Sequence, residues 1–118
     1  MKAIRGAITV KENKVDDIKD ASKELVSKII KANNINEEDI VSIVFTATSD
    51  IDKTYPAAVI REMGYTKTPL MCYQEMNVEN SLDKCIRTMV YCDCNRSLED
   101  IEHVYLRKAK TLRPDLVD

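Results

Sequence analysis

Two arginines stand inside segments whose alternating pattern is typical of strands. Arg5 lies among small residues in the segment 2–10, and Arg87 lies in the longer segment 82–92. Because a guanidinium stays charged at physiological pH, its burial requires anionic or hydrogen-bonding partners. The commoner interpretation is structural, namely ion pairs or an arginine that reaches water from an edge strand. The other is a binding site for an anion with more than one carboxylate, which two guanidinium forks would suit.

Three further side chains could take part in such a site. Glu75 directly follows the short segment 70–73, at a loop position of the kind where functional side chains gather. Cys72 lies near the end of that segment, and Tyr105 lies in the last apolar segment. Taken singly, each has an ordinary structural interpretation: a solvated glutamate, a small core thiol, and a packed phenol whose hydroxyl finds a partner.

The composition excludes several kinds of catalytic site. Gly6 and Gly64 are the only glycines, too few for a dinucleotide-binding fingerprint or a phosphate-binding P-loop. The single histidine, His103, rules out zinc sites of the two-histidine types, and Cys92 and Cys94 lack the spacing of a zinc knuckle. No cysteine is flanked by a recognisable nucleophile motif. We therefore expect neither a metal nor another cofactor.

The apolar pattern predicts the elements that must position these residues. Alternation predicts strands, and helical spacing from Ile18 to Ile29, behind Asp16 and Asp17, predicts one long helix. The expected elements are, in order, a strand over 2–10, a helix from 16 to about 32, a strand over 40–48, a helix of about two turns from Pro56, and strands over 70–73, 82–92 and 103–106.

This order indicates an α/β or α+β sandwich in which helices pack against a mixed sheet. The segments 40–48 and 82–92 look apolar on both faces, so their strands should be buried on both faces. One long helix cannot cover both faces of such a sheet. We therefore expect another subunit to cover the remainder.

Length and composition describe one globular domain, residues 1–118. Hydrophobic residues make up 44% of the chain and charged residues 32%, which is too apolar for a disordered chain. The 18 basic and 20 acidic residues leave a net charge of −2 and form no basic stripe for nucleic acid. Without an apolar run long enough for a signal peptide or a membrane span, we expect a cytoplasmic protein with reduced thiols and no membrane partner.

Several blocks of residues occur in an order and at a spacing that resemble one enzyme family. They are Ile4-Arg5-Gly6-Ala7, Ser49-Asp50, Pro56-Ala57, Val59-Ile60-Arg61, Cys72-Tyr73-Gln74-Glu75-Met76, Lys84-Cys85-Ile86-Arg87, His103-Val104-Tyr105-Leu106 and Leu112-Arg113-Pro114-Asp115-Leu116. Together they resemble the monofunctional, trimeric chorismate mutases over nearly the whole chain. The resemblance implies an α+β, ferredoxin-like mixed sheet with one long and one short helix. Three copies would form a pseudo α/β barrel with active sites between neighbours.

The resemblance also implies an activity, the isomerisation of chorismate to prephenate in aromatic amino acid biosynthesis, without a cofactor. Arg87 resembles the arginine at the ether oxygen, and Glu75 the carboxylate that accepts the ring hydroxyl, with Cys72 beside it. Arg5 and Tyr105 resemble the residues that hold the substrate carboxylates. The other residues implied at the cleft are Tyr55, Ala57, Leu70 and Met71 in its wall, Arg61 and Arg113 near its mouth, and Leu112.

Two positions depart from the family pattern, and two alternatives stay open. Ala58 stands where lysine is expected and Tyr55 where phenylalanine is expected, which concerns rim contacts and affinity. A trimeric small-molecule binder or imine deaminase would need one strand arginine for one carboxylate, whereas the mutase needs Arg87, Glu75 and Tyr105 on one ligand. In a purely structural trimer, the two arginines would simply pair with acidic residues.

Overall fold

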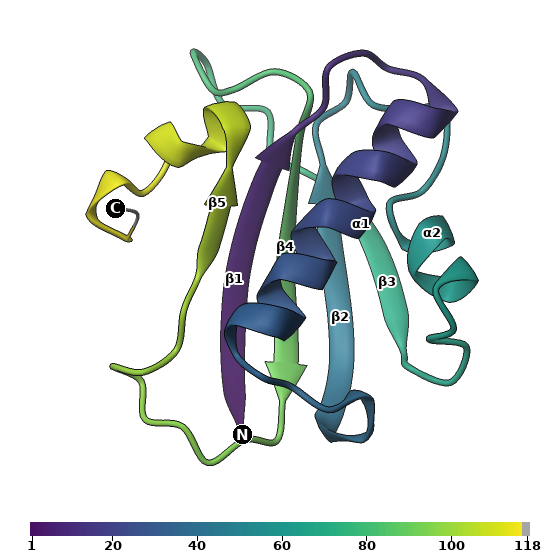
Figure 1. Ribbon diagram of the computed structural model, residues 1–118. Helices are drawn as coiled ribbons and strands as arrows, with labels where there is room; N and C mark the ends of the chain where they lie inside the picture. Colours follow the sequence, from purple (N-terminus) through teal and green to yellow (C-terminus); the bar gives the residue numbers. More distant parts are fainter. Residues whose placement is uncertain (117–118) are drawn as a thin grey trace.

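A five-stranded mixed sheet carries both helices on one face (Figure 1). The computed structural model describes residues 1–116, so the last two residues of the predicted domain lie outside the described part. The strands are β1 (Lys2–Thr9), β2 (Ile40–Ala47), β3 (Leu70–Gln74), β4 (Cys85–Cys92) and β5 (Val104–Leu106). The helices are α1 (Val15–Ala32) and α2 (Ala57–Glu62), with short 3-10 segments at Glu37–Asp39, Arg107–Thr111 and Pro114–Leu116.

The strands lie in the order β3-β2-β4-β1-β5. The central strand β4 runs antiparallel to β1 and β2, whereas the edge strands β3 and β5 run parallel to β2 and β1. The expected mixed α+β sheet with one long and one short helix is confirmed. Because α2 precedes β3, the order of elements differs from the β-α-β-β-α-β order of ferredoxin-like proteins.

The core lies between α1 and the inner face of the sheet. Ile18, Leu25 and Ile29 recur at helical spacing and are fully buried. They belong to one cluster with Ile8 of β1 and Phe45 of β2. This packing fixes which side of every strand faces the helix. Within residues 1–116, neither helix is long and apolar enough to cross a bilayer.

Alternation along the strands places a second set of side chains on the outer face of the sheet, which neither helix covers. On β2, Ile43 and Phe45 are fully buried, whereas Val44 and Thr46 stay partly exposed. Met71 of β3 is 54% exposed. The prediction that the strand over 40–48 is buried on both faces is therefore wrong for the single chain, because both helices pack on the same side. Cover by another subunit stays a prediction.

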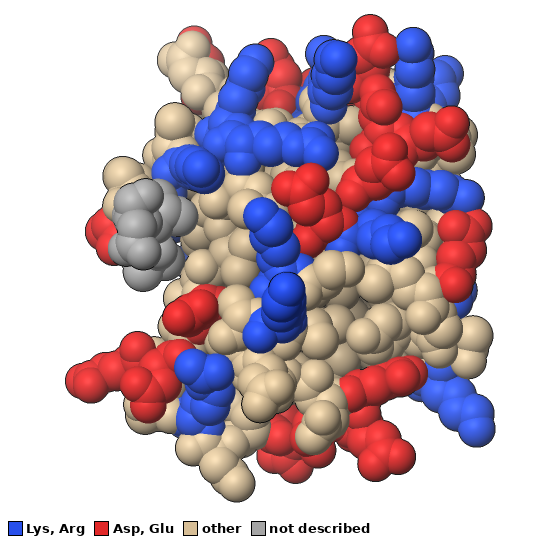
Figure 2. All heavy atoms as spheres, viewed as in Figure 1, with Lys and Arg blue, Asp and Glu red and all other residues tan. Residues whose placement is uncertain are grey.

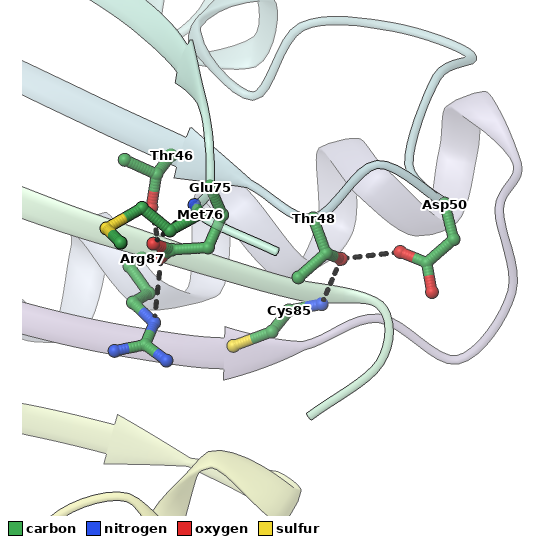
Figure 3. A network of polar contacts seen from close by, with 7 residues as sticks. All are labelled: Thr46, Thr48, Asp50, Glu75, Met76, Cys85 and Arg87. Atoms are coloured by element: carbon green, nitrogen blue, oxygen red, sulfur yellow. Dashed lines mark hydrogen bonds and ion pairs between the residues drawn. The ribbon is translucent and has the colours of Figure 1, made fainter. Parts of the chain in front are cut away.

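Strand β4 begins at Cys85 rather than at the predicted position 82, because the preceding loop extends to Lys84. Lys84 has a left-handed φ of 46°, and its N–H donates to the Asp50 carboxylate, 2.9 Å from Oδ2. The Cys85 N–H donates to Thr48 Oγ1 over 3.0 Å (Figure 3). These bonds fix the first residue of β4 and hence the position of Arg87, two residues further along.

Gly6 allows α1 to lie close against β1. A Cβ at this position would lie 2.7 Å from Ile29 Cδ1, 3.0 Å from Leu25 Cδ1 and 3.1 Å from the carbonyl oxygen of Val104. We expect Gly6→Ala to lower the free energy of unfolding by about 1–3 kcal/mol, because the added methyl overpacks the helix–sheet contact. Denaturant titration measures this loss. Ile29→Val removes the nearest atom, Cδ1, so Gly6→Ala should lower the free energy of unfolding by less in that background. An unchanged loss would contradict the explanation.

Candidate functional site

Strand pairing lines up residues of the outer face in one row that crosses the whole sheet. Tyr105 of β5 pairs with Ala7 of β1, Ala7 with Arg87 of β4, Arg87 with Thr46 of β2, and Thr46 with Tyr73 of β3. Side chains that share a row and a face are close neighbours. The register therefore brings Tyr105 and Arg87, distant in the sequence, to the same level of the outer face.

A pocket of about 270 Å³ lies over this row. Its lining includes four of the predicted site residues, Arg5, Glu75, Arg87 and Tyr105, together with Met89 and Tyr91. A larger hollow of about 530 Å³ at the carboxyl end of β1 has a mixed lining of basic and acidic side chains and holds none of the predicted residues. We place the candidate site at the smaller pocket, because the charges that are unusual for strands meet there.

Glu75 and Arg87 form an ion pair at one side of the pocket. Arg87 Nε lies 2.9 Å from Glu75 Oε1, and the two side chains are 36% and 20% exposed. The Nε–H does not point at an acceptor, so the contact is an ion pair without an aligned hydrogen bond. Figure 3 shows the terminal nitrogens of Arg87 pointing away from Glu75, and they form no ion pair with residues 1–116. The guanidinium therefore keeps its two-nitrogen fork for another partner.

Both oxygens of the Glu75 carboxylate are held by other donors. The Thr46 hydroxyl donates to Oε1 over 2.8 Å, and the Met76 N–H donates to Oε2 over 3.2 Å (Figure 3). The Glu75 N–H donates to the carbonyl of Ala47 at the end of β2 over 2.9 Å. The carboxylate therefore has a defined place above the sheet although it follows the last residue of an edge strand.

Two further donors face the pocket from its β1–β5 side. Tyr105 is 4% exposed, and its hydroxyl has no hydrogen-bond partner within the described part of the chain. Such a buried hydroxyl is costly unless something else binds it. The guanidinium of Arg5 forms no ion pair with any residue from 1 to 116. The pocket thus presents several donors and one carboxylate acceptor, a set suited to an anionic ligand that also carries a hydroxyl.

The other predicted residues fall into two groups. Leu112 packs against the cluster that contains Tyr105, and Arg113 forms a two-point ion pair with Asp115, at 2.8 and 3.0 Å. The second group lies at the β3 and α2 edge, outside this pocket, and consists of Tyr55, Ala57, Arg61, Leu70, Met71 and Cys72. Tyr55, which is 71% exposed, and Cys72 line a separate hollow of about 400 Å³. A single chain therefore does not bring this second group to Arg87.

Cys72 is poorly suited to act as a nucleophile. Burial raises the pKa of its thiol, although the Ala57 backbone and the nearby Arg61 charge oppose that shift. The thiolate is the nucleophilic form of cysteine, and a raised pKa disfavours it. The resemblance implies Cys72 beside Glu75, whereas the register pairs it with the buried Phe45 of β2, and it packs against the core cluster.

Sequence reasoning missed the other residues that line the pocket, among them Thr46, Met89 and Tyr91. Each is an ordinary strand residue, and nothing in its immediate neighbourhood marks it as functional. Met89 shares its face of β4 with Arg87, two residues away, and this spacing could have signalled it. Thr46 becomes visible only through the pairing of β2 with β4.

His103 supports the backbone beneath Arg5. Its Nδ1 accepts a hydrogen bond from the Arg5 N–H over 2.9 Å, which requires that nitrogen to be unprotonated. Burial lowers the pKa of His103 from its ordinary value of 6.5, and the charges of Arg5 and Arg113 lower it further. The folded chain therefore binds this proton less readily than the unfolded chain. The corresponding stability is complete above about pH 6.5 and is lost as the pH falls below it.

We expect the melting temperature of the protein to decrease on acidification from about pH 7 to pH 5, in part through this histidine. His103→Asn should flatten that part of the profile, because an amide oxygen can accept the same bond without titrating in this range. Thermal unfolding followed by circular dichroism at matched ionic strength measures both profiles. Identical slopes for the two proteins would contradict the assignment.

Comparison with known proteins identifies the family of this chain. The model of the chorismate mutase type I family matches residues 1–116. Chorismate mutase AroH of Bacillus subtilis (strain 168) is 40% identical over 117 residues, covering 98% of this chain and 92% of the relative. Chorismate mutase AroH of Thermus thermophilus is 38% identical over 117 residues, covering 98% and 96%.

A solved structure has the same fold. A chorismate mutase from Clostridium thermocellum superposes with a TM-score of 0.92 at 44% sequence identity, covering 94% of this chain and 99% of that one. The resemblance stated from the sequence blocks is thereby confirmed. The chain belongs to the chorismate mutase type I family.

Proposed function

We propose that this protein catalyses the rearrangement of chorismate to prephenate in the pocket on the outer face of the sheet. The observation that carries the proposal is the convergence of four groups in one pocket. They are the Arg5 guanidinium, the terminal nitrogens of Arg87, the Tyr105 hydroxyl, which has no hydrogen-bond partner in residues 1–116, and the held carboxylate of Glu75. Chorismate is a dianion with a ring hydroxyl. Its carboxylates can accept from Arg5, Arg87 and Tyr105, and its hydroxyl can donate to Glu75. Membership of the family supports the same reaction.

The reaction needs an environment rather than a reactive group. In the chair-shaped pericyclic transition state, the ether C–O bond breaks ahead of C–C formation, so the ether oxygen gains negative charge and the ring gains positive charge. A fixed cation beside that oxygen binds the transition state more tightly than the substrate. Arg87, which lines the pocket and whose terminal nitrogens point away from Glu75, supplies this cation.

The other residues of the pocket hold the substrate in the reactive conformation. Arg5 and Tyr105 bind the carboxylates, and Glu75 accepts the ring hydroxyl and faces the positive end of the developing dipole. Holding the flexible enolpyruvyl group over the ring removes orientational freedom before the bond exchange begins. No proton is transferred and no covalent intermediate forms, so no step calls for a metal or another cofactor.

A homotrimer with sites between subunits is part of the same proposal. The β3 and α2 group, which includes Tyr55 and Arg61, lies away from the Arg87 pocket in one chain. The uncovered outer face also exposes Met71 and Tyr73, each by 54%. A neighbouring copy that covers this face would bring its own second group to the pocket. We also keep a single domain over residues 1–118 and a cytoplasmic location as predictions.

A spectrophotometric assay tests the reaction. The purified protein, dialysed against a chelator, should consume chorismate and form prephenate without added metal or cofactor. Absence of turnover, or equal activity after heat denaturation, would contradict the proposal. Parallel incubation with imine substrates tests the deaminase alternative, which the matching family does not favour.

Light scattering tests the assembly. The expected mass is three times the 13.5 kDa of one chain at the protein concentration of the assay. A monomer that turns over chorismate at full rate would overturn the shared-site part of the proposal, while leaving the assignment of the reaction intact.

A further inference from the structure

The Thr46 hydroxyl donates a hydrogen bond to the Glu75 carboxylate of the ion pair at one side of the pocket. We propose that Thr46 is a positioning residue that restricts Glu75 to a one-point contact with Arg87 and so keeps the arginine's terminal nitrogens available to the substrate. This inference rests on the proposed function of the pocket.

The geometry around the Glu75 carboxylate supports this role. Thr46 pairs with Arg87 across β2 and β4, so both side chains rise from the same level of the outer face. The Thr46 hydroxyl lies 2.8 Å from Oε1, the same oxygen that Arg87 Nε approaches at 2.9 Å. The Met76 N–H holds Oε2 at 3.2 Å. The carboxylate is thus fixed at both oxygens by donors other than the arginine.

The contact between Arg87 and Glu75 departs from the usual preference of such pairs. Arginine and a carboxylate commonly form two parallel hydrogen bonds, because the planar fork matches both oxygens. Here the approach is through Nε alone, and that N–H is not aligned with an acceptor. A Glu75 side chain free to turn could take the terminal nitrogens of the arginine. Turning would break its bond to Thr46 and its bond to the Met76 N–H.

Removing the hydroxyl should therefore make Glu75 a competitor of the substrate. In Thr46→Val, which keeps the shape of the side chain, the carboxylate loses one of its two holding bonds and can pair with both terminal nitrogens of Arg87. The substrate then has to displace it. We expect kcat/KM to fall about tenfold, mostly through a higher KM, since a bond to a charged group is lost before the substrate binds.

Two matched variants separate positioning from stability. Thr46→Ser keeps a hydroxyl and should retain most of kcat/KM. Thr9→Val removes a buried hydroxyl that accepts the Lys108 N–H over 3.2 Å, and Thr9 does not line the pocket. It should lower the melting temperature at least as much as Thr46→Val and leave KM unchanged.

A double-mutant cycle decides whether Thr46 acts through Glu75. In a Glu75→Ala background, Thr46→Val should cause no further loss of kcat/KM, because the group that it holds is gone. Independent, multiplying losses would overturn the positioning role, as would failure of Thr46→Ser to restore the rate. If the wild-type protein turns over chorismate but the losses of kcat/KM from the two substitutions multiply, only this inference fails. If the wild-type protein is inactive, the proposed function fails with it.

Discussion

Replacing Arg87 by alanine is expected to lower kcat for chorismate by about a thousandfold, with little change in the assembly or in the melting temperature. The lost guanidinium is the one cation of the pocket that we place at the ether oxygen. Its ion pair with Glu75 is partly exposed and contributes little stability. Stopped assays at saturating chorismate measure kcat, light scattering on the same samples measures the assembly, and thermal unfolding followed by circular dichroism measures the melting temperature.

The conservative variant sharpens this result. Arg87→Lys should retain only part of the rate, because one ammonium cannot reproduce a two-nitrogen fork. As a control, Arg96→Ala removes an arginine that bonds the Asp100 carbonyl outside the pocket and should leave turnover near the wild-type rate. Near-normal turnover in Arg87→Lys would contradict the role given to the arginine.

The second large effect is expected at Glu75. Glu75→Ala should lower kcat/KM about a hundredfold, because the ring hydroxyl loses its acceptor and the positive end of the transition-state dipole loses its counter-charge. Glu75→Gln should lose less, since the amide oxygen can still accept from the ring hydroxyl and from Thr46. Steady-state kinetics with chorismate compares the two variants.

Equal losses in the two Glu75 variants would mean that the negative charge matters more than the hydrogen bond. Glu79→Ala, which removes an exposed glutamate four residues further along the same loop, is the matched control and should have no effect on kcat/KM. A loss in the control as large as that in Glu75→Ala would place the effect in the loop rather than in the carboxylate.

Local pattern was sufficient to predict most of the elements. The helix expected from 16 to about 32 is α1 (Val15–Ala32), because its apolar spacing and its acidic start act within a few turns of chain. The start of β4 is set instead by bonds between Asp50 and Lys84, 34 residues apart. No local rule reports such a contact, and so the predicted strand began three residues too early.

The candidate site was predictable to the extent that its residues are chemically unusual where they stand. Charged Arg5 and Arg87 are conspicuous in strands, whereas Thr46 is a common strand residue and passes unnoticed. The two interpretations of Arg87 also turn out to be compatible. It does pair with a carboxylate, as the structural interpretation expects, but through one nitrogen, which leaves its fork for a ligand.

The short edge strands limit backbone pairing between newly made chains. The three inner strands, β1, β2 and β4, have eight residues each, whereas the edge strands β3 and β5 have five and three. An edge offers unpaired N–H and C=O groups to any extended segment nearby, and a short edge offers few. Newly synthesised copies can therefore associate through side chains on the outer face of the sheet. The short edge strands β3 and β5 offer few unpaired backbone groups for amyloid-like strand addition.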